Sequence, residues 1–159
     1  MQGEIVIEES SESLVLAKGL SDICESLLKL SINIITAHWN LQGIEYGVLH
    51  PKLGSDYHNI IESMDKVAER AVILGGGPLM GTQVNNVNPN TMLIGDVISS
   101  YEQAQRLINY FINNEGSKDE VSKNMLTDIQ EQLQKLLGFL NQTYKSYEPE
   151  MEEPEMMEN

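Results

Sequence analysis

The sequence contains one cysteine and no apolar run that approaches the length of a membrane span. Because Cys24 has no partner, no intrachain disulfide can form. Its neighbours in the sequence are apolar, so we expect a small buried thiol there. The N-terminus also lacks the basic region and the apolar run of a secretory signal. These absences predict a cytoplasmic protein with no membrane-spanning segment.

Basic residues are scarce as well. The chain has 10 Lys and Arg against 24 Asp and Glu, which gives a net charge of −14. Ten of the acids lie near the ends, four in residues 1–13 and six in residues 148–159, and neither segment contains a base. Nucleic-acid binding depends largely on Lys and Arg at the phosphates. We therefore expect no direct nucleic-acid partner.

No convincing strand pattern is present, and the apolar residues recur instead at helical spacing. A first helix is expected to begin near residues 10–13, where serine hydroxyls can cap it, and to end at Trp39. Its expected inner stripe is Leu16, Leu20, Ile23, Leu27, Leu30 and Ile34. His38 follows Leu20 by five helical turns, so it lies at the end of the same stripe.

Three more helices are predicted. The second begins at residues 48–51 and ends at the glycines 75–77, and a long connection follows in which a short helix has room to form over 78–91. The expected inner stripe of the second helix is Leu53, Tyr57, Ile61, Met64 or Asp65, Ala68 and Val72. The third helix spans about 91–113 and the fourth about 118–144. The short turn between them favours antiparallel neighbours.

These elements predict an all-α fold, a four-helix bundle with a long connection between helices 2 and 3. The expected inner residues of the last two helices are Leu93, Val97, Tyr101, Leu107 and Ile108, then Val121, Met125, Ile129, Leu133, Leu136, Leu137 and Leu140. We divide the chain into an acidic arm (1–9), the bundle (10–147) and an acidic tail (148–159). The tail has charge and proline but no core, so we expect it to be disordered.

Residues 38–77 hold all three histidines and the only tryptophan. Asp65 and Glu69 are four residues apart, so they project from one helix face. Asp65 also interrupts the expected apolar stripe, where an unpaired carboxylate is costly. His38 interrupts the first stripe, and His50 follows across the loop. Two imidazoles and two carboxylates suit Fe(II), Zn, Mn or Co.

Other interpretations of these residues remain open. A histidine at a helix end is often a cap, and an Asp-x-x-x-Glu pair is often a solvated face. Lys66 and Arg70 alternate with the acids and can pair with them. Trp39 can donate its indole N–H to a carboxylate or pack in the core. His58 shows no comparable pattern, and we assign it to a structural or surface position.

One motif is missing from the candidate site. Di-iron bundles supply Glu-x-x-His motifs from within one subunit, and this chain has none. A single bundle is therefore short of ligands. This shortage predicts a site that is completed by a neighbouring subunit.

The same stretch resembles the Dps proteins, the ferritin-like mini-ferritins also called DNA-binding proteins from starved cells. The intervals of 12, 15 and 4 residues between His38, His50, Asp65 and Glu69 match the ferroxidase ligands of that family. The similarity extends weakly over all four helices, including an Asp-x-x-Ser start of the last one. The other matching elements are Trp39-Asn40, Gly43, Ala68-Glu69-Arg70-Ala71-Val72 and Leu74-Gly75-Gly76.

This resemblance implies a ferritin-like bundle that assembles into a hollow dodecamer with ferroxidase sites at two-fold interfaces. Each site would take His38 and His50 from one subunit and Asp65 and Glu69 from another. Fe(II) would be oxidised there, preferentially by hydrogen peroxide, and stored as an Fe(III) mineral, which protects against oxidative damage. Trp39 would act as an electron donor.

The chain departs from the members that give the family its name. They often bind DNA through a basic N-terminal tail, whereas Lys18 is the first base here. Direct DNA binding is therefore not expected. The alternative function is a structural or zinc-binding helical-bundle cage without ferroxidase activity.

Overall fold

A computed structural model describes residues 11–76 and 94–145. Our predictions for the acidic arm, for a short helix in the connection, for Leu93 and for the acidic tail lie outside these residues.

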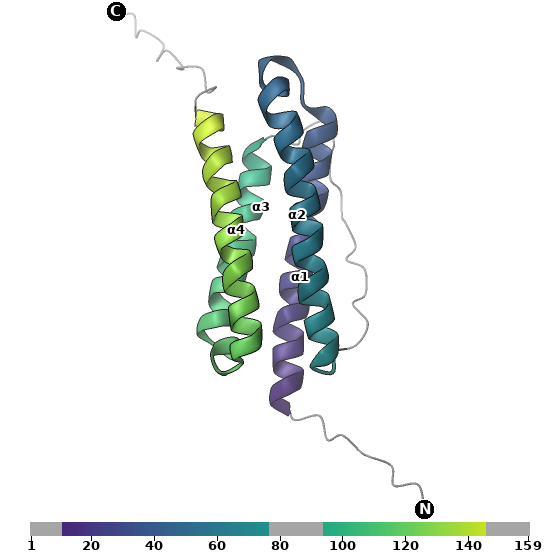
Figure 1. Ribbon diagram of the computed structural model, residues 1–159, viewed down its shortest axis with the longest axis vertical. Helices are drawn as coiled ribbons and strands as arrows, with labels where there is room; N and C mark the ends of the chain where they lie inside the picture. Colours follow the sequence, from purple (N-terminus) through teal and green to yellow (C-terminus); the bar gives the residue numbers. More distant parts are fainter. Residues whose placement is uncertain (1–10, 77–93, 146–159) are drawn as a thin grey trace, which may run out of the picture.

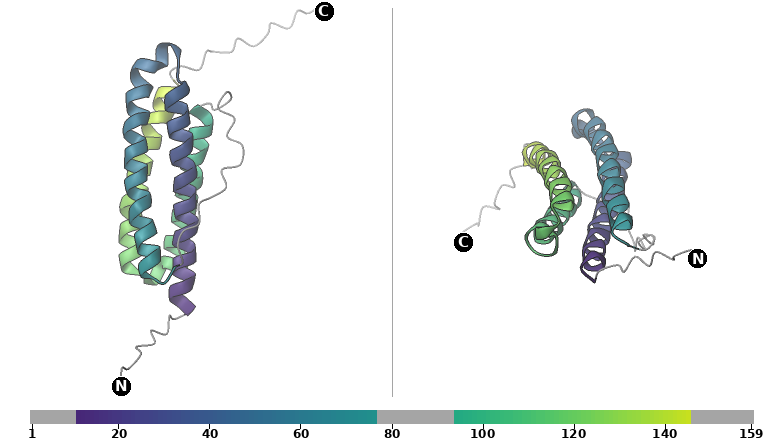
Figure 2. Two further views of the ribbon diagram at one scale, coloured as in Figure 1. Left: turned by 90° about the vertical axis from the view of Figure 1, so that its right-hand side faces the viewer. Right: turned by 60° about the horizontal axis from the view of Figure 1, so that its bottom comes forward.

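The described residues form four long helices: α1 (Ser11–Asn40), α2 (Tyr46–Ile73), α3 (Ile94–Asn113) and α4 (Glu120–Lys145). Two short 3₁₀ turns, η1 (Gly43–Glu45) and η2 (Glu115–Lys118), precede α2 and α4. The four helix axes are roughly aligned, with α1 antiparallel to α2 and α3 antiparallel to α4 (Figure 1), and a tilted view shows α1–α2 and α3–α4 as two layers (Figure 2). The predicted all-α four-helix bundle is confirmed. None of the described helices is both long and apolar enough to span a membrane.

The core follows the predicted stripe on α1. All six apolar residues of that stripe are buried, and Cys24 is buried beside them, as predicted. Tyr101 and Leu133 bring fully buried side chains from α3 and α4. Each fully buried side chain of this size stabilises the fold by about 1.5–3 kcal/mol through the hydrophobic effect. The other buried residues on these two helices are Ile94, Val97, Ala104, Ile108, Phe111, Ser122, Leu126, Ile129, Leu136 and Leu140.

The predicted inner stripe of α2 is correct at Leu53 but wrong by about one position beyond it. Asp65 and Val72 are exposed rather than inward. The reason is that α2 carries apolar residues on two faces, so that periodicity alone did not identify the inner one. The buried residues are Leu49, Leu53, Asp56, Ile60, Ser63, Val67 and Ala71. Val121 on α4 was also predicted inward and is exposed, whereas Leu126 is buried.

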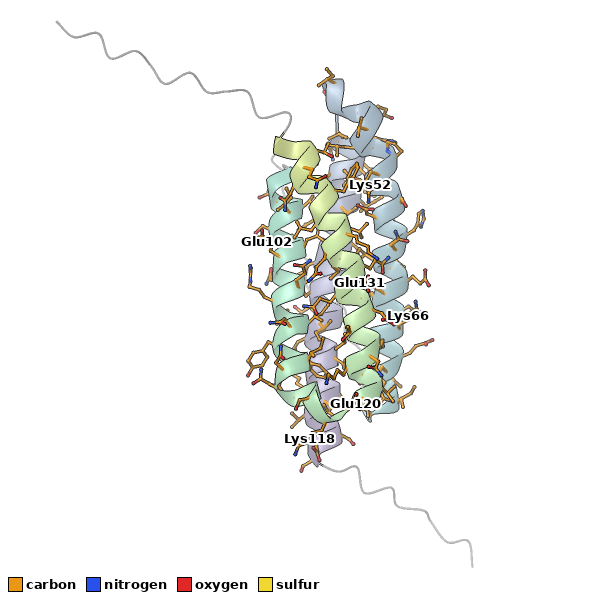
Figure 3. All side chains as sticks on the ribbon, turned by 60° about the vertical axis from the view of Figure 1, so that its left-hand side comes forward. Lys52, Lys66, Glu102, Lys118, Glu120 and Glu131 are labelled. Carbon is orange, nitrogen blue, oxygen red and sulfur yellow. The ribbon has the colours of Figure 1, made fainter. Side chains whose placement is uncertain are left out.

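Polar contacts join α2 to the α4 side of the bundle. The Ser63 hydroxyl lies 3.2 Å from Gln132 Oε1 and donates to it. The Lys52 ammonium lies 5.2 Å from the centroid of the Phe139 ring, in the part of α2 labelled in Figure 3. These contacts show that the interface between the two helices is partly polar.

Asp56 lies deeper in the bundle and is fully buried. Lys52, one turn earlier on α2, forms an ion pair with it. The Tyr101 hydroxyl is 3.5 Å from Asp56 Oδ2. Burial raises the pKa of Asp56 above its ordinary value, although Lys52 and Tyr101 act in the opposite direction.

Arg70 links α2 to the start of α4. Its Nη2 donates to both carboxylate oxygens of Asp119 at 3.0 Å, and its Nε donates to the Ser122 hydroxyl at 3.0 Å. Arg70 therefore does not pair with the acids of its own helix. Lys66 pairs with Glu62 at 3.1 Å, so among the described residues neither base of this segment pairs with Asp65 or Glu69.

Asp119 caps α4. Its carbonyl accepts from the Lys123 N–H at 2.9 Å, and its carboxylate accepts from the Ser122 N–H at 3.4 Å. Burial opposes ionisation of Asp119, but hydrogen bonds from Ser122 and Arg70 outweigh it and lower the pKa of this carboxyl below its ordinary value. Asp119, the first residue of the Asp-x-x-Ser element, thus caps α4 and also forms an ion pair with Arg70 of α2.

We expect Asp119→Ala to lower the free energy of unfolding by about 2 kcal/mol at neutral pH, since it removes both the cap and the partner of Arg70. A lowered pKa means that this stabilisation is present above the unfolded-state pKa and is lost as the pH falls through the folded-state pKa. Urea unfolding at several pH values would test this. Asp119→Asn, which keeps the cap, should lose less; equal losses would contradict the role of the cap, and no loss in Asp119→Asn would contradict the role of the ion pair.

Candidate metal centre

The two candidate histidines meet where α1 joins α2. The His38 and His50 rings stack with centroids 3.8 Å apart and an interplanar angle of 26°. His38 Nδ1 lies 2.8 Å from the His50 backbone carbonyl oxygen. A carbonyl only accepts, so Nδ1 carries the hydrogen and donates it. In the neutral form of this ring the Nε2 atom carries no hydrogen and can bind a metal ion.

Gly54 provides the space for the His38 ring. A β-carbon at this position would lie 3.1 Å from His38 Cε1, which is tighter than an ordinary contact. Glycine inside a helix lowers helix stability by about 1 kcal/mol relative to alanine. At this position the absence of a β-carbon leaves room for the His38 ring. Tyr46 also stacks on His50, with centroids 4.3 Å apart.

Tyr46 and Gly54 were not identified from the sequence. Each is four residues from His50, one before and one after it, so all three share one side of α2. That spacing was the available signal. It is too common in helices to single out either residue without the position of His38.

The two candidate carboxylates lie elsewhere on α2. Asp65 and Glu69 are exposed on its outer face. Over residues 11–76 and 94–145, neither has an ion pair or a hydrogen-bonded side-chain partner. Glu69 borders a shallow, mainly apolar pocket that it lines together with Ala68, Val72 and Ile73. The prediction that Asp65 and Glu69 share a helix face is correct, but that face points out of the bundle.

A single chain does not bring the four candidate ligands together. His50 and Asp65 are fifteen residues apart on one helix, which separates them by about 22 Å along its axis. In the described part of the chain, no three His, Cys, Asp or Glu side chains are grouped closely enough to hold a metal ion. The bundle therefore separates the candidate ligands into two candidate half-sites, a histidine pair and a carboxylate pair.

Trp39 and His58 have exposed side chains. Trp39 is 72% exposed, so the interpretation that it packs in the core is wrong. His58 is exposed on α2 and has an edge contact with Tyr57, with ring centroids 5.5 Å apart. The surface assignment of His58 is correct. The role of Trp39 as an electron donor remains a prediction.

A family model described as a ferritin-like domain matches residues 17–148. The chain belongs to the ferritin-like family. Antigen TpF1 of Treponema pallidum (strain Nichols) is 26% identical over 149 residues, covering 82% of this chain and 84% of the antigen. The DNA protection during starvation protein of Listeria innocua is 38% identical over 48 residues, which covers 31% of that protein. An uncharacterised protein of Haemophilus influenzae is 33% identical over 67 residues, and this match spans only 42% of its length.

Solved structures of antigen TpF1 and of Dps proteins superimpose on the bundle. The crystal structure of antigen TpF1 from Treponema pallidum has a TM-score of 0.71 at 21% identity, covering 86% of this chain and 95% of that one. An N-terminal deletion mutant of Dps from Mycobacterium smegmatis has a TM-score of 0.74 at 20% identity, covering 86% and 98%. At these identities the likeness shows the fold. The resemblance to the Dps proteins is confirmed at that level.

Proposed function

We propose that this ferritin-like protein is a Dps-type mini-ferritin that binds and oxidises Fe(II) at sites shared between two subunits. The division of the four candidate ligands into two half-sites carries this proposal. A two-fold axis places each half of one subunit against the complementary half of its partner. Each interface then holds two sites, with His38 and His50 from one subunit and Asp65 and Glu69 from the other.

The donor atoms suit iron in both oxidation states. Imidazole nitrogen binds Fe(II) well, and carboxylate oxygen is a hard ligand that favours Fe(III). Hydrogen peroxide and two protons accept one electron from each of two Fe(II) ions, which gives two Fe(III) and two waters. The protein would store the Fe(III) as a mineral inside a dodecameric cage. Removing Fe(II) and peroxide together limits oxidative damage.

The solved structures add one observation about the histidines. One of the matching structures is a Listeria innocua Dps in which two histidines twelve positions apart are replaced by glycine. His38 and His50 have the same separation. This agreement supports the assignment of the two residues as a functional pair. The net charge of −14 argues against direct DNA contact.

The test replaces one ligand from each half-site. We expect His50→Ala and Asp65→Ala each to slow peroxide-driven Fe(II) oxidation by at least about tenfold, because each removes a metal ligand from every site. Stopped-flow absorbance would measure the rate, and size exclusion would show whether assembly is retained. Glu62→Ala is the matched control, because Glu62 is an exposed acid of the same helix outside the proposed ligand set.

Unchanged oxidation rates in both ligand variants would refute the ligand assignment. Iron that elutes apart from the protein would refute storage. The alternative function, a structural or zinc-binding cage, rests on the same His and carboxylate donors, which also suit zinc. Tight zinc binding by a protein that does not accelerate Fe(II) oxidation would favour that alternative.

A further inference from the structure

We propose that Gly54 and Tyr46 are positioning residues of the candidate metal centre, because they hold its two imidazole rings in one fixed arrangement before a metal ion binds. This inference rests on the proposed function, in which His38 and His50 are metal ligands. Tyr46, His50 and Gly54 follow one another at intervals of four residues, so they lie on one side of α2. The His38 ring reaches this side from α1.

The His50 ring is the middle member of a stack of three rings. Its centroid lies 4.3 Å from that of Tyr46 and 3.8 Å from that of His38, with interplanar angles of 27° and 26°. One face of an imidazole has no room for two stacked rings, so Tyr46 and His38 lie against opposite faces of His50. Stacked aromatic pairs attract each other beyond the burial of their area. The stack therefore restricts rotation of the His50 ring from both sides.

Gly54 borders the His38 ring at the edge that carries both nitrogens. A β-carbon at this position would lie 3.1 Å from Cε1, 3.5 Å from Nδ1 and 3.9 Å from Nε2 of that ring. The ring already stacks on His50 and donates from Nδ1 to the His50 carbonyl oxygen at 2.8 Å. It can make room for a methyl group only by giving up part of these contacts. A side chain at position 54 therefore disturbs the same ring that would bind the metal through Nε2.

The backbone does not require glycine at position 54. This residue lies inside α2, and the described glycines with positive φ are Gly43 and Gly75. Alanine is more favourable than glycine inside a helix. The close approach of the His38 ring is therefore the observation that accounts for this glycine. His38 is only half-buried, so the contact belongs to the candidate metal centre rather than to the apolar core.

Gly54→Ala tests the proposal by separating metal binding from folding. We expect alanine to leave the urea-unfolding midpoint of the metal-free protein unchanged or to raise it, because alanine favours the helix. We expect the same change to weaken Co(II) binding by at least about tenfold, because it displaces a ligand ring from its supporting contacts. Co(II) suits the same imidazole and carboxylate donors. A titration followed by visible absorption measures its dissociation constant without any iron oxidation.

Gly138→Ala is the matched control for this substitution. Gly138 also lies inside a long helix, α4, and a β-carbon there would meet nothing within 4 Å. Alanine at this position should favour its helix in the same way and leave the Co(II) dissociation constant at the wild-type value. Equal weakening of Co(II) binding in both glycine variants would overturn the role of Gly54.

Two substitutions of Tyr46 test the other end of the stack. Tyr46→Phe keeps the ring and removes the hydroxyl, so we expect it to bind Co(II) as the wild type does. Tyr46→Leu removes the ring and should weaken Co(II) binding by about two- to tenfold, which corresponds to the free energy of one aromatic pair. Size exclusion would establish that both variants assemble as the wild type does, because the Tyr46 side chain is exposed.

The outcomes separate the positioning roles from the proposed function. Weaker Co(II) binding by Gly54→Ala and Tyr46→Leu, at unchanged stability and assembly, supports both roles. Wild-type Co(II) binding in either variant overturns the role of that residue, and so does a loss of affinity that only accompanies a loss of stability.

Fe(II) oxidation is measured separately on the wild type. If the variants bind Co(II) weakly and the wild type does not oxidise Fe(II), the ferroxidase proposal fails and the positioning roles stand. If the wild type oxidises Fe(II) and the variants bind Co(II) normally, only the positioning roles fail. Failure of the wild type to bind Co(II) overturns both.

Discussion

A mixture of His50→Ala and Asp65→Ala subunits should recover about a quarter of the wild-type Fe(II) oxidation, although each variant alone is expected to be slowed by at least about tenfold. The reason is the geometry of a shared two-fold site. In a mixed dimer, one site receives both substitutions and the other receives neither. Random pairing makes half of the dimers mixed, and each mixed dimer has one intact site out of two.

Joint unfolding and refolding of equal amounts of the two variants would produce the mixed assemblies. Stopped-flow measurement of Fe(II) oxidation with peroxide then gives the recovered rate. The matched control mixes His38→Ala with His50→Ala, which damage the same half-site and should recover nothing. If refolded wild type is active and neither mixture is, the site lies within one subunit and the proposed division is wrong.

Lys52→Met is expected to cost about 3 kcal/mol of folding free energy at neutral pH, because it leaves the Asp56 carboxylate buried without its ion-pair partner. Asp56 is fully buried, and the Lys52 side chain is only 24% exposed, so water does not replace the missing charge. Methionine keeps much of the apolar stem of lysine. The loss should therefore come mainly from the charge. Chemical denaturation would measure it.

The pH dependence identifies the cause. The pKa of Asp56 is already raised in the folded protein by burial, and removing Lys52 takes away the hydrogen bond and the charge that partly lower it. A raised pKa contributes stability that is present below the unfolded-state value and is lost as the pH rises through the folded-state value. The variant should therefore approach wild-type stability in acid and diverge from it toward neutral pH.

Lys135→Met is the matched control for this prediction. Lys135 forms the same kind of (i, i+4) pair with Glu131, which is labelled in Figure 3, at 2.9 Å, but both side chains are mostly exposed. Exposed pairs contribute little to stability. A loss for Lys135→Met as large as that for Lys52→Met would show that the burial of Asp56 is not the cause.

The sequence by itself determined the helices and the candidate ligand types. The apolar stripe of α1 repeats with the helical period, and the glycines after α2 and the short turn before α4 mark helix ends. These are local properties of the backbone and of side-chain spacing. The spacing of four residues predicted that Asp65 and Glu69 share one face of α2. The absence of Glu-x-x-His motifs indicated that a single bundle has too few ligands for a di-iron site.

Only the tertiary structure decided which face of α2 is buried. Periodicity shows which residues share a face, but α2 has apolar residues on both sides, and the packing against α1 selected the face with Ile60 and Val67. The same packing placed Asp56 inside and joined Arg70 to Asp119 rather than to a nearby acid. Contacts between helices depend on residues far apart in the chain, which no local spacing encodes.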